Sequence, residues 1–213
     1  MNSLINTILV FVLLINLYLL ATSRIRALIQ GAALQGILLS FMPLLVQKQI
    51  GLMAPVIALA TLALKGSVIP GMLFKALRDA QIKREVEPLI GLVPSMLLGA
   101  LGTGISIAFA SHLALASQQI NPLIIPAAFS TVFTGFLLLI TRIKAISQVI
   151  GYLILENGIY IFGMLLLEAM PFLVELGVLL DLFVGVFVVS IIIHHINRQF
   201  ASLDTRRLSA LKE

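Results

Sequence analysis

The sequence contains no cysteine and no tryptophan, and only 11% of its 213 residues are charged. Without cysteine, disulfides, thiolate metal ligands and cysteine nucleophiles are excluded. An average soluble domain carries about 25% charged residues, so this chain has too little polar material to cover a surface in water. Hydrophobic residues make up 60%, and the mean hydropathy is +1.13. The composition therefore excludes a soluble globule and a disordered chain, and it indicates an integral membrane protein.

Seven long apolar stretches follow one another along the chain, each near the roughly 20 residues that span a bilayer as a helix. None alternates apolar and polar residues as a barrel strand does. The fold class is therefore predicted as all-α: one polytopic membrane bundle of about seven transmembrane helices. The predicted spans are Leu4–Ala21, Ala27–Val46, Leu52–Leu73, Leu89–Leu115, Ile124–Ile140, Ala145–Ala169 and Phe172–Ile193. Four glycines of the fourth span (Gly91, Gly99, Gly102, Gly104) are predicted to be helix-packing positions.

The basic residues predict the orientation. With seven spans, twelve of the fourteen Lys and Arg residues fall on one side of the membrane, in loops and in the carboxy-terminal tail. Lys48 lies on the other side, and Lys65 lies inside a span. Basic residues accumulate in the cytoplasm, so the amino terminus is predicted outside and the carboxy terminus inside. The net charge of +5 then reflects topology, and no nucleic-acid partner is expected.

Two similar segments predict an internal duplication. Arg24-Ile25-Arg26-Ala27 precedes the second span, and Arg142-Ile143-Lys144-Ala145 precedes the sixth, an offset of 142 − 24 = 118. Mid-span charges at Lys65 and Asp181 are offset by 181 − 65 = 116. We therefore expect two parallel three-helix repeats, residues 1–85 and 119–200, joined by a connecting helix in 86–118 and followed by a tail, 201–213. A basic segment before an apolar run is also common wherever a helix starts on the cytoplasmic side. The similarity of the two segments is therefore also explained without a duplication.

Three ionisable residues fall near the middle of predicted spans: Lys65 in the third, Glu156 in the sixth and Asp181 in the seventh. Each costs about 2.5–3.5 kcal/mol or more at the bilayer centre, so all three are expected to face the bundle interior or a neighbouring subunit. One interpretation is a buried pair or triad that only fixes helix packing. Packing alone rarely needs ions, because apolar replacements of buried ion pairs are often neutral. A proton or ion path is therefore favoured.

Weaker candidates for the path or its hydration are neutral polar residues within spans and ionisable residues near span ends: Gln35, Gln148, Asn157, Glu175, His194 and His195. Pro70 removes the hydrogen bond to the carbonyl of Gly66, next to Lys65, and this predicts a locally distorted, hydrated helix. The histidines at 194 and 195 are explained equally well by favourable charge at a helix carboxy terminus. No catalytic residue, cofactor-binding motif or metal-ligand set is recognised.

The sequence resembles the family of hydrogenase-4 component E, a membrane subunit. The resemblance rests on Gly151-Tyr152 through Leu155-Glu156-Asn157-Gly158, on Val174-Glu175-Leu176-Gly177 followed by Asp181, on the spacing from Lys65 to Pro70 and on the tail Ser202-Leu203-Asp204. It covers most of the chain. The family is related to the K subunit of respiratory complex I and to the C subunit of multisubunit sodium/proton antiporters, three-helix proteins with buried Glu residues.

The resemblance implies a non-catalytic membrane-arm subunit of a [NiFe] hydrogenase-type complex in a prokaryotic cytoplasmic membrane. Its partners would be antiporter-like membrane subunits, a quinone-subunit-like anchor and peripheral hydrogenase-type subunits that hold the Ni-Fe and iron–sulfur clusters; none is expected in this chain. Glu156 and Asp181 would take the roles of the family's buried Glu residues, whereas Gln35 and Lys65 depart from that pattern in the first repeat. The alternatives are a stand-alone secondary transporter and a purely structural assembly subunit.

Overall fold

The computed structural model describes residues 2–46, 53–79, 88–112 and 121–165, together with the single residues Gly177, Phe183, Gly185 and Ser190. Within these ranges every regular element is a helix, which confirms the predicted fold class. Six helical spans are long and apolar enough to cross a membrane, and they match the first six predicted spans. The seventh, Phe172–Ile193, lies outside the described residues except for those four single positions.

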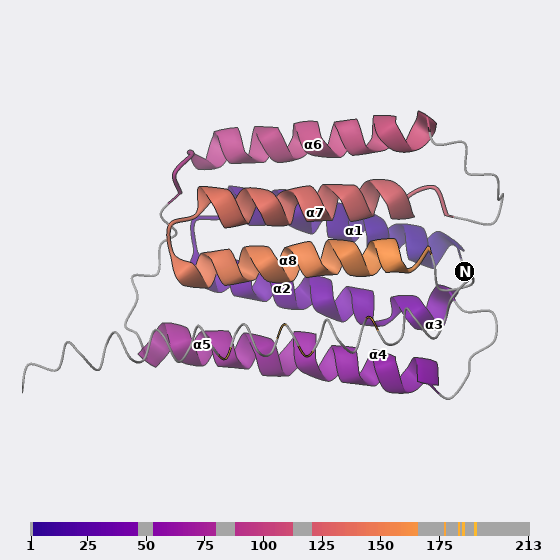
Figure 1. The fold of residues 1–213 in the computed structure, drawn as a ribbon, viewed down its shortest axis with the longest axis horizontal. Coiled ribbons are helices and arrows are strands. Elements are labelled where there is room, and N and C mark those ends of the chain that lie inside the picture. The colour runs from indigo at the N-terminus through magenta and orange to yellow at the C-terminus, as the bar shows by residue number, and fades with distance from the viewer. Residues whose placement is uncertain are drawn as a thin grey trace, which may run out of the picture.

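The helices run side by side along the long axis of the bundle (Figure 1). They are α1 (Asn2–Ala21), α2 (Ile25–Ser40), α3 (Met42–Val46), α4 (Met53–Ala63), the π-helical turn η1 (Leu64–Val68), α5 (Ile69–Asp79), α6 (Leu92–His112), α7 (Ile124–Thr141) and α8 (Ala145–Gly163). Helices α1, α2, α7 and α8 form the centre, with α6 at one edge and the α4–η1–α5 span at the other.

Helices α7 and α8 make the closest contact in the bundle. A Cβ atom added to Gly158 would lie 2.6 Å from the backbone nitrogen of Val132, and one added to Gly135 would lie 2.5 Å from that of Leu155. Any side chain at these positions would collide with the facing backbone, so the close approach requires glycine. Small residues are common at helix contacts in membranes, where lipid tails provide no hydrophobic drive between helices. The pair is therefore held backbone to backbone.

Helix α6 packs more loosely, through a stripe of small residues. Its buried residues are Ser95, Gly99, Gly102 and Ser106. Gly99 faces Leu20 and Gly102 faces Phe133, whereas Gly104 has no neighbouring atom within 4 Å of an added Cβ. The predicted packing role is therefore confirmed for Gly99 and Gly102. For Gly104 the prediction is wrong, because this residue lies on the outward face of the helix.

Two spans are irregular, each near a proline. The second span is interrupted at Phe41, between α2 and α3, because Pro43 lacks an amide donor and restricts the residue before it. The third span contains η1 immediately before Pro70. The distortion that Pro70 predicts is therefore present, as a π-helical turn that includes Lys65.

One end of the bundle, which we call the basic end, contains the α1–α2 and α7–α8 connections and the last turns of α5. All described Lys and Arg residues except Lys65 lie there: Arg24, Arg26, Lys75, Arg78, Arg142 and Lys144. Lys75 and Arg78 belong to α5, not to the loop expected after Leu73. Basic side chains are favourable in a last helical turn and reach the membrane boundary by extending along their apolar stems, so the helix continues past them.

Candidate functional site

Lys65 and Glu156 meet in the middle of the bundle. Lys65 is residue 8 of the 21 in its span, and Glu156 is residue 12 of the 19 in α8. Their side chains are almost fully buried, with 7% and 1% of the residue surface exposed. The distance from Lys65 Nζ to Glu156 Oε2 is 3.9 Å. The two charges therefore compensate each other electrostatically, at a separation longer than a direct hydrogen bond.

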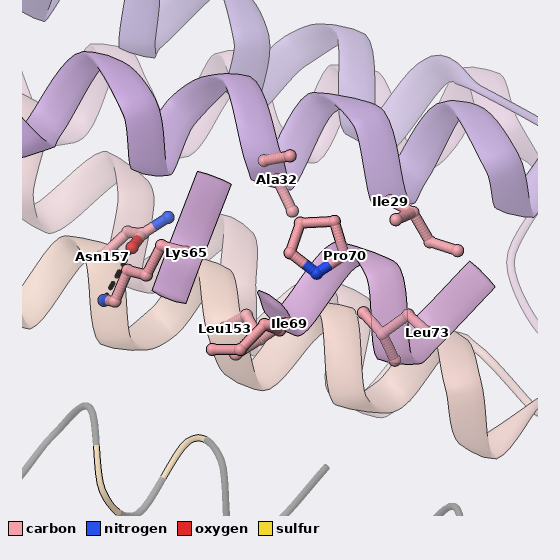
Figure 2. A pocket seen from close by; sticks show the side chains of 9 residues that line it. Ile29, Ala32, Lys65, Ile69, Pro70, Leu73, Leu153 and Asn157 are labelled. Carbon is pink, nitrogen blue, oxygen red and sulfur yellow. Dashed lines mark hydrogen bonds between the residues drawn. The ribbon is translucent and has the colours of Figure 1, made fainter. Parts of the chain in front are cut away.

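Three buried amides, which we call the amide chain, continue from Lys65 across the bundle. Lys65 Nζ donates to Asn157 Oδ1 at 3.0 Å, and Asn157 Nδ2 donates to Gln35 Oε1 at 3.1 Å. Gln35 Nε2 then donates to Asn16 Oδ1 at 2.9 Å. Exposure of these amides is 2% or less. The chain thus joins the third span to α8, α2 and α1 by side-chain hydrogen bonds alone (Figure 2 shows its first bond).

The far end of the amide chain lies on α7. Asn16 Nδ2 donates to Thr131 Oγ1 at 2.8 Å, and the Thr131 hydroxyl donates to the carbonyl of Ala127 at 2.7 Å. Lysine has only donors, so Asn157 must present its oxygen to Lys65. Each amide then passes its N–H₂ to the next oxygen, as far as Thr131. Every hydrogen bond in the series therefore points away from Lys65.

Local structure brings Lys65 to this position. A Cβ atom added to Gly36 of α2 would lie 2.8 Å from Lys65 Cβ, so glycine at 36 allows α2 to approach the π-helical turn. Lys65 Nζ also lies 5.7 Å from the centre of the Tyr160 ring, within the range of a cation–π interaction. The ammonium group therefore has a carboxylate, an amide oxygen and an aromatic face around it.

Glu156 also faces the predicted seventh span. A Cβ atom added to Gly185 would lie 3.2 Å and 3.3 Å from the two carboxylate oxygens of Glu156, and Gly185 is buried. Asp181, Glu175, His194 and His195 lie outside the described residues. Gly185, one residue of the span predicted to carry Asp181, therefore lies beside the buried carboxylate.

The other sequence candidates divide between this site and the basic end. Gln35 and Asn157 belong to the amide chain, whereas Gln148 is exposed and donates to the backbone carbonyl of Arg142 at 3.0 Å. Sequence reasoning missed Asn16 and Thr131. Asn16 is a lone amide within the apolar first span, and that isolation was a usable signal. Thr131 had none, because threonines in membrane helices commonly bond the preceding turn, as Thr141 does here.

Arg142 is a second buried cation, at the basic end. It is 1% exposed, and its Nη2 donates at 3.0 Å to the carbonyl of Leu20 near the end of α1. Burial lowers the pKa of its guanidinium group. The sequence predicted Arg142 in a loop. The connection between α7 and α8 is short, and within it the Arg142 side chain turns inward to the end of α1. Bonding a carbonyl at a helix carboxy terminus is a structural role.

Within the described ranges, no group of three His, Cys, Asp or Glu side chains is arranged to hold a metal ion. At mid-span, Lys65 and Glu156 form a pair that is linked to neutral amides. Such a pair can exchange or relay a proton, and it can also pin helices together.

Comparison with known proteins gives one long and one short similarity. The chain is 32% identical over 193 residues to the uncharacterized protein Rv0085 of Mycobacterium tuberculosis, which covers 89% of this chain and 87% of that protein. It is 33% identical over 78 residues to hydrogenase-4 component E of Escherichia coli K12 and of Shigella flexneri, 37% of this chain and 36% of those proteins. This second similarity is shorter than the resemblance seen in the sequence. No family model and no solved structure matches the chain.

Proposed function

The chain belongs to the family of the uncharacterized protein Rv0085 of Mycobacterium tuberculosis, and from that premise we propose that it is a non-catalytic membrane subunit of a complex I-like, hydrogenase-type complex. The similarity of part of the chain to hydrogenase-4 component E supports this assignment, as do the six apolar spans. The proposed partners are antiporter-like membrane subunits, a quinone-subunit-like anchor and peripheral subunits that hold the redox clusters.

Within such a complex, Lys65, Glu156 and Asp181 would contribute to proton translocation. The observation that carries this proposal is the Lys65–Glu156 pair, two buried ionisable groups 3.9 Å apart at mid-span. Ionisable residues at this depth are rare and usually functional. Asp181 joins them on the strength of its mid-span place in the sequence and the contact of Gly185 with Glu156.

The pair can move a proton without changing its net charge. When Lys65 Nζ passes a proton to Glu156 Oε2, an ammonium and a carboxylate become a neutral amine and a neutral carboxylic acid. If instead a proton arrives at Glu156 from outside the pair, the ammonium loses its counter-charge, and a buried unpaired charge is strongly unfavourable. Protonation of Glu156 therefore favours proton release from Lys65, which couples the two groups.

The positive-inside rule supplies the proposed orientation. The basic end of the bundle would face the cytoplasm, which places the amino terminus of α1 on the opposite side. Proton exchange at Lys65 and Glu156 would then take place roughly midway between the two aqueous phases.

The test is proton translocation by the assembled complex in inverted membrane vesicles, driven by its own electron donor. Glu156→Gln and Lys65→Gln keep side-chain size and hydrogen bonding but remove the titratable group, and we expect each to abolish translocation. Lys75→Gln, on the same span and exposed, is the matched control and is expected to behave as the parent. Assembly is checked by co-purification of the partner subunits.

Two results would overturn the proposal. Full translocation by both mid-span variants in an intact complex would leave the pair a purely structural role. A chain that is purified alone, stable and active in ion transport would identify a stand-alone secondary transporter instead.

A further inference from the structure

A polar pocket lies at the basic end of the bundle, at the connection between α1 and α2. Its volume is about 750 Å³, which is within the range of sites that hold small molecules. The pocket is open to the surface, because most of the residues that line it are exposed. Six of its seven described lining residues carry polar groups: Tyr18, Thr22, Ser23, Arg24, Arg26 and Gln30.

The pocket is positively charged. Arg24 and Arg26 supply two guanidinium groups, and none of the described lining residues is acidic. Within the part of the chain that the structure describes, neither guanidinium group forms an ion pair. A guanidinium group binds phosphate through two parallel N–H donors, and Thr22, Ser23 and Gln30 can add further donors. The side chains that line the pocket are therefore those of a phosphate-binding site.

The similar basic segment between α7 and α8 is used differently. Arg142, the counterpart of Arg24 in that segment, turns inward and donates to the carbonyl of Leu20. It is fully buried, whereas Arg24 and Arg26 are exposed. Arg142 thus bonds the backbone near the end of α1, and the two arginines of the α1–α2 connection are available to a ligand from outside the chain.

Exposed apolar helix faces extend from the pocket toward the middle of the bundle. On α1, Phe11, Leu14 and Tyr18 are each about half exposed, and their spacing of three and four residues places them on one face. On α2, Leu34 is also about half exposed and lies one turn beyond Gln30. A polar pocket that continues into apolar faces matches a phospholipid, which has a charged head group and apolar chains.

We propose that this pocket binds the phosphate group of an anionic phospholipid, whose acyl chains lie along the exposed faces of α1 and α2. Phosphate in solution has the same charged chemistry, but only a lipid also covers the apolar faces. Basic pockets between helices at the membrane boundary bind the head groups of anionic lipids in other membrane proteins. The site is separate from Lys65 and Glu156, and it does not depend on the function proposed above.

Photo-crosslinking in lipid vesicles tests the site. The probes are phosphatidylglycerol, which carries one negative charge, and phosphatidylcholine, which has no net charge, each with a photoreactive group in an acyl chain. The full complex is reconstituted in phosphatidylcholine vesicles that contain a small fraction of either probe, so that labelling is proportional to affinity. Peptide mapping then measures the label on α1 and α2.

We expect the phosphatidylglycerol probe to label α1 and α2 about thirtyfold more than the phosphatidylcholine probe, because two arginines contribute. Arg24→Gln combined with Arg26→Gln should lower this labelling nearly to that of phosphatidylcholine. Lys75→Gln combined with Arg78→Gln removes two exposed charges from the same end of the bundle. This matched control is expected to be labelled as the parent is.

A second variant keeps the test valid if the glutamine variant does not assemble. Arg24→Lys combined with Arg26→Lys retains both positive charges, which also orient the spans. Lysine binds phosphate as a point charge, without the paired donors of arginine, so labelling by phosphatidylglycerol should fall severalfold. Labelling equal to that of the parent would contradict recognition by the guanidinium groups.

Four further results would overturn the proposal. Equal labelling by the two probes would show that the apolar faces accept any lipid. An equal fall in the Lys75 and Arg78 control would show that the lipid is attracted only by the total charge of this end. Loss of labelling in phosphate buffer, relative to chloride at the same ionic strength, would identify phosphate from solution as the ligand. An absence of label from α1 and α2 would show that a partner subunit covers them.

Discussion

The two halves of the buried pair are held by very different supports. Glu156 and Asn157 belong to α8, which is packed against α7 backbone to backbone at Gly135 and Gly158. Lys65 belongs to η1, a π-helical turn that interrupts the third span just before Pro70. π-turns inside α-helices are rare and are frequent at functional sites. The carboxylate and the first amide are therefore held on closely packed helices, whereas the ammonium is carried on the irregular element.

This difference locates any movement within the site. The close α7–α8 packing holds the backbone of Glu156 and Asn157 in place, so we expect a change in the 3.9 Å separation to come from the third span. A small cavity lies against that same span, beside Pro70. We infer that the α4–η1–α5 span is the element whose changes would alter proton exchange first.

The largest effect is expected where the rigid support is broken. Gly158→Ala would place a Cβ 2.6 Å from the backbone nitrogen of Val132, and backbone cannot move aside as a flexible side chain can. Overpacking of this kind costs about 3 kcal/mol. We therefore expect loss of folded protein, measured as the amount of chain recovered in the complex. Gly104→Ala, on the open face of α6, is the control and is expected to express normally; normal recovery of Gly158→Ala would contradict the close packing.

A smaller effect is expected on the irregular support. Gly36→Ala would bring a Cβ to 2.8 Å from Lys65 Cβ, and the π-helical turn can shift away at a cost of about 2 kcal/mol. We expect the complex to assemble while translocation falls, because Lys65 moves relative to Glu156. The measurement is translocation per assembled complex. Assembly lost together with translocation would show that this contact is as rigid as the α7–α8 pair.

The amide chain should give the smallest effect. Thr131→Val removes the acceptor of Asn16 Nδ2 while it keeps the shape of the side chain, and a buried donor left without a partner costs about 1 kcal/mol. Thr141→Val is the matched control, since Thr141 is equally buried and makes the same bond to the preceding turn. Stability is measured by detergent-induced unfolding of the full chain, followed by circular dichroism. Thr131→Ser keeps the hydroxyl group and should have the stability of the parent. Equal losses of stability in Thr131→Val and Thr141→Val would contradict the amide chain.

These contrasts show which parts of the molecule the sequence could predict. Long apolar runs specify membrane helices by themselves, so six spans and the buried positions of Lys65 and Glu156 followed from the sequence. Pro70 predicted a distortion because its missing donor is a local property. That Lys65 bonds Asn157 rather than a closer residue depends on how α2, α8 and the third span pack. Contacts 92 residues apart in the chain leave no local pattern.

Arg142 shows the same limit of sequence-based prediction for a residue that was expected to be solvated. A basic residue between two spans predicts a solvated loop, yet the side chain is buried against the end of α1. Its burial follows from the tight α7–α8 connection and from a backbone pairing between Arg142 and Pro88, neither of which a single-sequence pattern reveals.

The most direct test of the central claim is whether Glu156 changes its protonation state during turnover. Infrared difference spectroscopy of the active complex detects the C=O stretch of a protonated carboxyl group, and labelling with ¹³C-glutamate identifies it as glutamate. We expect a turnover-dependent carboxyl band that shifts with the label and is absent from Glu156→Gln, while the Lys75→Gln control retains it. A glutamate band that persists unchanged in Glu156→Gln would show that the buried pair at mid-span does not carry the proton.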